Sequence, residues 1–286
     1  MSDMFSPKKA FAFFAAFLIL GSITLADVHA QVAPAVASAE SQAQGKKPKR
    51  KLPTGLLELS GYKVPVFLYV PEGLEIDRKY PFLVMVPNET TPAKNQLEYI
   101  LPVAKSLECF VLAVDAWPKE GEPFVFDRWL LQVKEDMMMR FPIDSSKVYA
   151  IGRNGGGHYA AYLISAYPNE FSGAAFLGEA WDGLYVQLFN PRASAGDQMP
   201  VVAAFTANQQ TTKIKNEKWV LEYQQKGYPV HVMDVTGEEG FDSSEFKVSL
   251  LEWLDQKSQA WKLVREEKNK TFKQRFKKGV KEFFEV

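Results

Sequence analysis

A glycine-rich turn near the middle of the chain has the spacing of a turn that presents a nucleophile. The segment "VYAIGRNGGGHYAAYL" (148–163) predicts a β-strand, a tight turn and a helix. Gly152 and Gly156 fit the pattern G-x-S-x-G, in which the central serine attacks the substrate. Asn154 stands at the serine position. Because an amide nitrogen is delocalised and forms no acyl intermediate, we predict no catalytic residue at this turn.

The other reactive residue types are scarce. A serine nucleophile needs a neutral imidazole as base and a carboxylate that orients it. Beyond the first thirty residues the histidines are His158 and His231, and we expect both to be structural. Two histidines without carboxylates at ligand spacing make a poor metal site, so we expect no metal and no cofactor. The single cysteine, Cys109, opens an apolar strand and is expected to be a packed thiol.

Strands and helices alternate from residue 55 onward. Apolar runs of strand length are separated by segments with helical periodicity, and 56–71 predicts a hairpin with its turn at Ser60-Gly61. This alternation predicts an α/β fold with a doubly wound, mostly parallel sheet in three layers, α/β/α. The predicted strands are 81–87, 109–116, 148–152, 172–178, 200–206 and 229–235, and the predicted helices 94–108, 126–140, 155–167, 212–226 and 244–256.

The order of these elements resembles the α/β-hydrolase superfamily, with its esterase and polyester-depolymerase-like branch as the nearest match. The resemblance covers about 55–256 and is specific around "VYAIGRNGGGHYAAYLISAYPNEFSGAAFLGEA" (148–180). It implies a catalytic acid in the turn after 200–206, where Asn208 stands. It implies a histidine in the loop 236–245, which holds none, and Gly240 lies at the matching place. With Asn154, all three positions of the catalytic triad are therefore degenerate.

The resemblance also implies an oxyanion turn after the strand 81–87. Here that turn is Pro87-Asn88-Glu89-Thr90. Proline has no N–H to donate, and a carboxylate would oppose a developing oxyanion. Ligands of open α/β sheets bind at the carboxyl ends of the strands, where polar and aromatic residues remain. The candidate cleft residues are Asn88, Trp117, Arg153, Asn154, Gly155, Glu179, Trp181 and Asp182.

These observations favour a non-catalytic binding or scaffold protein that uses the former active-site cleft for a small polar ligand or a protein partner. Three alternatives stay open. Trp181 could simply cap the core, and Glu179 with Asp182 could form a glycosidase-like pair. The chain could also be an active carboxylic-ester hydrolase whose nucleophile is a serine in 243–249 acting with His231.

The N-terminal residues predict export. Lys8-Lys9 precede an apolar run, and Val28-His29-Ala30 resembles a cleavage site, as in a secretory signal peptide over 1–30. The product would be secreted or periplasmic, and a retained membrane anchor is the alternative. Residues 31–54 predict a disordered Ala/Gln/Ser linker that carries the basic cluster Lys46–Lys51.

The last segment, 257–286, predicts a basic amphipathic helix. Its apolar residues fall at near-helical spacing: Trp261, Val264, Phe272, Phe276, Val280 and Phe283. Docking on the domain or on a second copy is one interpretation. Weak contact with an anionic surface, through this helix or through Lys46–Lys51, is the other. The chain carries 34 Lys and Arg against 34 Asp and Glu, so we expect no nucleic-acid partner.

Overall fold

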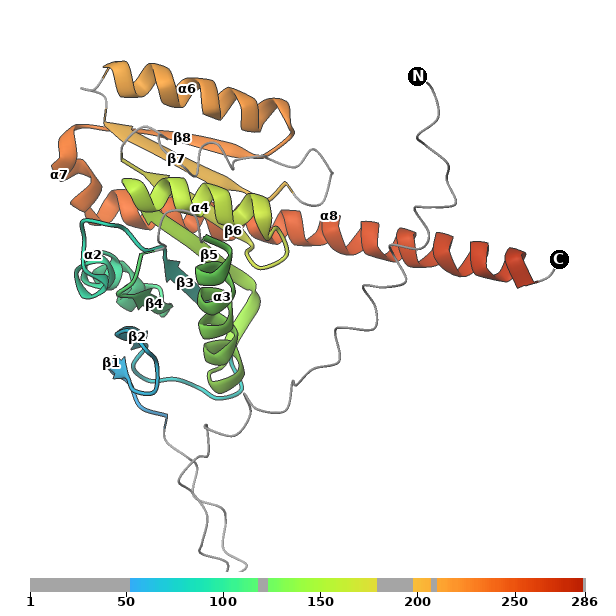
Figure 1. The fold of residues 1–286 in the computed structure, drawn as a ribbon, viewed down its shortest axis with the longest axis horizontal. Helices are drawn as coiled ribbons and strands as arrows, with labels where there is room; N and C mark the ends of the chain where they lie inside the picture. The colour runs from blue at the N-terminus through green and yellow to red at the C-terminus, as the bar shows by residue number, and fades with distance from the viewer. Residues whose placement is uncertain (1–51, 118–122, 179–197, 207–209, 285–286) are drawn as a thin grey trace, which may run out of the picture. The chain divides into compact units, whose positions relative to one another are not determined.

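One eight-stranded sheet covered by helices on both faces organises the chain (Figure 1). The computed structural model describes residues 52–117, 123–178, 198–206 and 210–284. The strands are β1 (Gly55–Leu59), β2 (Val66–Val70), β3 (Tyr80–Met85), β4 (Phe110–Val114), β5 (Ile143–Arg153), β6 (Gly173–Leu177), β7 (Val201–Thr206) and β8 (Val230–Val235). The helices are α2 (Ala93–Ser106), α3 (Pro123–Arg140), α4 (Gly155–Ala166), α6 (Gln210–Gln225), α7 (Gly237–Asp242) and α8 (Ser244–Phe284).

The strand order confirms a doubly wound, mostly parallel sheet. The strands lie in the order β1-β2-β4-β3-β5-β6-β7-β8. β1 pairs with β2 and β2 with β4 in antiparallel fashion, whereas every pair from β4 to β8 is parallel. The predicted hairpin is present, with Leu59 opposite Val66. The carboxyl ends of β3 to β8 therefore meet at one edge of the sheet.

The core consists of two apolar layers, one on each side of the sheet. Strands β4, β6 and β7 are buried along their whole length because helices cover both faces, which explains their continuous apolar sequences. The core side chains of α3 and α4 pack in one layer, together with Trp261 of α8, and those of α2, α7 and the first part of α8 pack in the other. This arrangement confirms the predicted three layers.

The C-terminal part differs from the sequence prediction in one respect. We predicted a helix over 244–256 and a distinct helix over 257–286. The structure has a single helix, α8, of 41 residues from Ser244 to Phe284. No proline interrupts this stretch, and Gly279 near its end is tolerated within the helix. The predicted loop 236–245 also holds the short helix α7.

The predicted signal peptide and nearly all of the predicted linker lie outside the described residues. Within the described part of the chain, no helix has both the length and the apolar character needed to cross a membrane.

Candidate functional site

The turn between β5 and α4 has the backbone of a strained elbow. Asn154 is the single residue between the two elements, with φ of 49° and ψ of −124°. Its N–H donates to the carbonyl of Leu177 at the end of β6, 2.7 Å away, and its carbonyl accepts from Gly157 N–H at 2.8 Å. The positive φ expected at the elbow tip is confirmed.

The ψ angle changes how this strain is explained. We expected asparagine to suit the site because it tolerates positive φ. That tolerance applies mainly to the left-handed helical region, where ψ is about +30° to +60°. Since Asn154 has a ψ of −124°, it lies outside that region. The surrounding hydrogen bonds, rather than the preference of asparagine, therefore hold the conformation.

Two glycines of the elbow are required by close packing. A Cβ on Gly152 would collide with the Gly156 carbonyl, and a Cβ on Gly156 would lie 2.9 Å from the Pro87 carbonyl oxygen. The start of α4 thus sits directly against β5 and against the turn after β3. This requirement exists whether or not the elbow is catalytic, so it explains why the glycine pattern is present without a serine.

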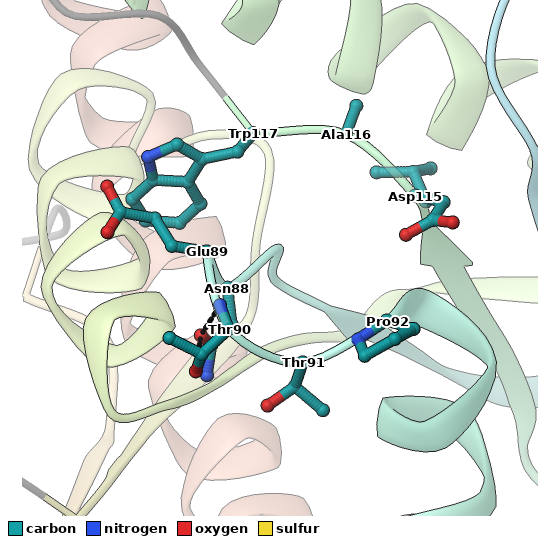
Figure 2. Close-up of a pocket in the computed structure, with 9 residues that line it drawn as sticks. Asn88, Glu89, Thr90, Thr91, Pro92, Asp115, Ala116 and Trp117 are labelled. Carbon is teal, nitrogen blue, oxygen red and sulfur yellow. Dashed lines mark hydrogen bonds between the residues drawn. The ribbon is translucent and has the colours of Figure 1, made fainter.

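A pocket of about 290 Å³ lies beside the elbow at the carboxyl ends of β3 and β4. Figure 2 shows its two walls, the turn after β3 and the segment after β4. Its lining residues are Asn88, Glu89, Thr90, Thr91, Pro92, Val114, Asp115, Ala116 and Trp117. The Trp117 ring reaches the elbow, where Cη2 lies 3.8 Å from the position that a Cβ on Gly155 would take.

Asn88 ties the pocket wall to the elbow. Its Nδ2 donates to the Arg153 carbonyl at 3.1 Å, and its Oδ1 accepts from the N–H and the hydroxyl of Thr90, each at 2.9 Å. The side chain is buried, and all three bonds are internal. Asn88 therefore has a structural role that the sequence did not indicate, next to its place in the pocket lining.

Arg153 has its side chain on the α2 and α8 side of the sheet. Its guanidinium carbon lies 3.9 Å from the centre of the Tyr99 ring, and Lys247 Nζ lies 4.0 Å from the same centre. Lys247 Nζ also donates to the Tyr99 carbonyl at 2.7 Å. Burial lowers the pKa of Lys247, and the positive charge of Arg153 lowers it further, against the opposing effect of Asp242. Arg153 thus joins a cation–aromatic cluster and is not among the pocket-lining residues that the structure describes.

The position matched to the catalytic histidine has little space for one. Gly240 lies in α7, and a Cβ there would collide with Cγ1 of Val235 at the end of β8. The neighbouring Phe241 is buried, and its carbonyl accepts from the Tyr99 hydroxyl at 2.8 Å. These contacts pack α7 tightly against α2 and β8. Asn208, Glu179, Trp181 and Asp182 lie outside the described residues.

The other candidate reactive groups are separate from the pocket. His231 stacks on Trp253 with 5.1 Å between ring centres. His158 is half-buried in α4. Cys109 is buried, which confirms a packed thiol, and burial raises the pKa of that thiol to about 12. Among the described residues, no group of three His, Cys, Asp or Glu side chains could hold a metal ion.

A buried carboxylate below the elbow helix was missed by the sequence reasoning. Asp127 of α3 is fully buried and accepts hydrogen bonds from the hydroxyls of Tyr159, Tyr162 and Tyr167. Burial raises the pKa of Asp127, and the three hydroxyl donors partly offset that rise. The Tyr159 ring also packs edge-on against Trp117 at 6.1 Å. The cluster therefore links α3 and α4 to the pocket wall, and a lone Asp in the apolar start of α3 was its only sequence signal.

Comparison with solved structures identifies the architecture. FphF, a fluorophosphonate-binding serine hydrolase of Staphylococcus aureus, is 13% identical with a TM-score of 0.54, over 70% of this chain and 96% of that one. An S-formylglutathione hydrolase from Agrobacterium tumefaciens is 14% identical with a TM-score of 0.52, over 71% of this chain and 94% of that one. A thermostable esterase is 17% identical with a TM-score of 0.51, over 70% of this chain and 61% of that one.

These likenesses define the class of fold. With its doubly wound sheet and the elbow after β5, this protein has the α/β-hydrolase fold. No family model matches the chain, and no curated protein matches it. At such low identity the comparisons show the fold alone, and the activities of these enzymes are theirs.

Proposed function

We propose that this α/β-hydrolase-fold protein is a non-catalytic binding protein that holds a small polar ligand in the cleft beside the elbow. The observation that carries the proposal is Asn154 at the tip of a strained elbow between β5 and α4. The geometry of a nucleophile turn is present, and an amide stands where the nucleophile would be. In one well-studied serine hydrolase, loss of the nucleophile costs on the order of 10⁶ in turnover.

Two features around the elbow support loss of the remaining machinery. Pro87 in the turn after β3 has no N–H that could stabilise an oxyanion, and the exposed Glu89 adds negative charge beside it. Gly240, at the place matched to the base, is packed against Val235. Each feature opposes a different part of acyl transfer, so a single compensating residue would not restore the reaction.

The pocket itself is suited to binding. Trp117 offers an aromatic face, and Asn88, Thr90 and Thr91 offer polar groups. Two carboxylates, Glu89 and Asp115, belong to the lining, and no Lys or Arg does among the residues that the structure describes. Because two carboxylates oppose an anion, the lining favours an uncharged, hydroxyl-bearing ligand or a cationic one.

Activity-based labelling tests the absence of catalysis. The purified chain is incubated with a fluorophosphonate probe and separately with short acyl esters, with FphF as the positive control. We expect no labelled residue and no ester turnover above the buffer rate. Labelling of one serine together with turnover well above background would overturn the proposal.

Thermal-shift screening tests the cleft. Polyols, sugars and organic cations are screened with the parent chain and with Trp117→Ala. We expect a ligand that raises the melting temperature of the parent, with the shift reduced in the variant because the aromatic face is gone. A ligand whose shift is the same in both chains would place the binding site elsewhere.

The alternative is that the protein is an active esterase, as some of its structural neighbours are. It requires a serine in 243–249 that acts with His231. His231 stacks on Trp253, and no hydrogen bond joins it to a serine in the described part of the chain. Ser243 instead caps α8, since its Oγ accepts from Phe246 N–H at 3.1 Å. Mass spectrometry of any labelled peptide would decide between Ser243, Ser249 and other positions.

We further propose that the protein is exported, with cleavage near Ala30. The support is the sequence pattern of Lys8-Lys9, the apolar run from Ala10 to Leu20 and the small residues of 28–30. Expression of the full chain in a bacterium, followed by mass spectrometry of its N-terminus, tests this. We expect a mature chain that begins near Gln31, whereas an intact leader on a cytoplasmic product would contradict export.

A further inference from the structure

Helix α8 stops packing on the sheet domain about one turn after Trp261. Trp261 is 9% exposed and is part of the core. The Arg265 guanidinium carbon lies 5.0 Å from the centre of the Trp261 ring, and the Arg265 side chain donates to Asn169 Oδ1. These contacts form the last described attachment of the helix, and α8 then continues beyond the sheet toward the C-terminus (Figure 1).

We call residues 262–284 the C-terminal extension. Its described side chains from 262 to 274 are all exposed except Arg265, which is half-buried. Leu263 and Val264 are 67% and 53% exposed. The described side chains of the extension therefore have few packing partners in the rest of the described chain. Most helices in proteins are stabilised by such tertiary packing, which the extension lacks over its described side chains.

The charge of the extension is strongly one-sided. It contains nine Lys and Arg residues and three Glu residues. Since the whole chain carries equal numbers of basic and acidic residues, the rest of the chain has a matching acidic excess. The net charge of the chain is zero only because the acidic remainder balances this basic helix. A basic helix is attracted to a surface of negative charge.

Apolar residues follow a helical spacing along the same segment. In the sequence, Phe272, Phe276, Val280 and Phe283 continue the series that begins with Trp261 and Val264. Because α8 is unbroken over this range, the spacing places these positions along one side of the helix. Trp261 itself is buried in the core, so the positions that the extension adds are Phe272, Phe276, Val280 and Phe283. Apolar positions on one side of a helix, with the Lys and Arg positions from 268 onward on the other sides, are the pattern of a helix that lies in a membrane interface.

We propose that the C-terminal extension binds the surface of an anionic phospholipid bilayer, lying in the interface without crossing it. A second copy fits less well, since two strongly basic helices side by side repel each other. The other exposed large apolar residues of the described chain do not form one stripe along a single helix, although Leu221 and Val232 line the same pocket: Leu56, Ile76, Val125, Met139, Leu221 and Val232. The inference stands independently of the elbow and its cleft.

Vesicle flotation of the intact chain tests the proposal. Vesicles of phosphatidylcholine with 30% phosphatidylglycerol are compared with pure phosphatidylcholine, at low salt and in 1 M NaCl. We expect binding to the anionic vesicles, weak binding to the neutral ones, and a marked loss at high salt because surface charge is screened.

Charge reversal of three exposed lysines provides the decisive variant. Lys268→Glu/Lys270→Glu/Lys273→Glu replaces three positive charges with three negative ones, and the loss of each positive charge alone weakens binding to an anionic surface about fivefold. We expect the variant to bind anionic vesicles at least about 100-fold more weakly than the parent. The matched control, Lys63→Glu/Lys79→Glu/Lys94→Glu, reverses three exposed lysines on the sheet domain and should bind as the parent does.

Three results would overturn the proposal. One is the absence of flotation with anionic vesicles. Another is equal flotation of the reversed variant and its control. The third is a dimer of the parent, seen by light scattering, that becomes a monomer on charge reversal without any vesicle binding, which would assign the extension to a second copy. Circular dichroism of both variants excludes loss of the helix as the cause of any difference.

Discussion

The side chain of Asn154 occupies the space that a Cβ on Gly178 would need. Asn154 is the elbow tip after β5, and Gly178, with φ of +101°, directly follows β6. The two strand ends are also joined by the hydrogen bond from Asn154 N–H to the Leu177 carbonyl. The elbow conformation and the conformation of the neighbouring strand end therefore depend on each other.

Gly178→Ala should lower the free energy of unfolding for two reasons. Positive φ costs alanine about 1–2 kcal/mol, and the new methyl group meets the Asn154 side chain. Gly73→Ala is the matched control, because Gly73 has φ of +74° with open space around its Cβ position. Urea unfolding should show a larger loss for Gly178→Ala than for Gly73→Ala.

The double variant Asn154→Gly/Gly178→Ala isolates the steric part of that loss. Removing the Asn154 side chain should bring the cost of Gly178→Ala down to about that of Gly73→Ala. If Gly178→Ala costs no more than Gly73→Ala in the parent background, the two side chains do not compete for this space.

Asn154→Ser should not produce a hydrolase. A serine hydroxyl at the elbow would lack a base, and general-base assistance typically contributes 10²–10⁴-fold. We expect ester hydrolysis by the variant to stay close to the buffer rate. Adding Asn208→Asp and Gly240→His should recover at most a trace, because a side chain at 240 meets Val235. Substantial activity of Asn154→Ser alone would reveal a base that we have not recognised.

Asn154→Val and Asn154→Gly should have opposite effects on stability. A β-branched residue fits positive φ poorly, so Asn154→Val should lose about 1–3 kcal/mol of unfolding free energy. Glycine adopts this conformation freely, so Asn154→Gly should be as stable as the parent or slightly more stable. Thermal melts of the three chains provide the comparison. A valine variant as stable as the parent would mean that the strained elbow is absent in solution.

Tyr162→Phe should destabilise the protein in a pH-dependent way. The Tyr162 hydroxyl donates to Asp127 Oδ2 at 2.7 Å, and a hydrogen bond to a charged group contributes about 1.5–3 kcal/mol. Burial raises the pKa of Asp127 in the folded state, so the folded carboxyl takes up its proton before the unfolded one as the pH falls. The loss caused by Tyr162→Phe should therefore be full at a pH above the raised pKa of Asp127, where the carboxyl is ionised.

The same loss should shrink as the pH falls through the raised pKa of Asp127, because the protonated carboxyl no longer offers a charged acceptor. Tyr223→Phe is the control, since the Tyr223 hydroxyl donates to the neutral carbonyl of Ala161. Urea unfolding from pH 7 down to pH 4 should give a pH-dependent loss for Tyr162→Phe and a constant one for Tyr223→Phe. A constant loss for both variants would contradict a change in the charge of Asp127 within this pH range.

The elements of the fold could be predicted because they depend on local periodicity. Buried strands such as β4 and β7 are short apolar runs, and α2 shows the 3.6-residue repeat in its buried residues, which include Ala93, Leu97, Ile100 and Ala104. The boundary between the last domain helix and the tail could not be predicted. The sequence changes its charge there, but backbone hydrogen bonding continues through Trp261 and Arg265 without a break.

The candidate site was predictable in part. The sequence placed Asn154 at the elbow and Asn88 and Trp117 near it, because these residues follow the ends of strands that the fold brings to one edge. It did not show that the Arg153 guanidinium stacks on the Tyr99 ring, nor that Asp127 accepts hydrogen bonds from three tyrosine hydroxyls. Both depend on contacts between α3, α4, α2 and α8, and such long-range contacts have no local signature.

The sequence by itself determined the α/β architecture and the absence of a serine at the elbow, since residue type and strand-to-helix periodicity are properties of the chain. Only the tertiary structure decided why the elbow glycines are needed, and that the position of Gly240 has little space for a side chain. It also decided where α8 leaves the domain, after Trp261. These features arise where segments distant in the sequence approach each other closely. Steric exclusion and burial act between such segments only in the folded chain, because only there do they meet.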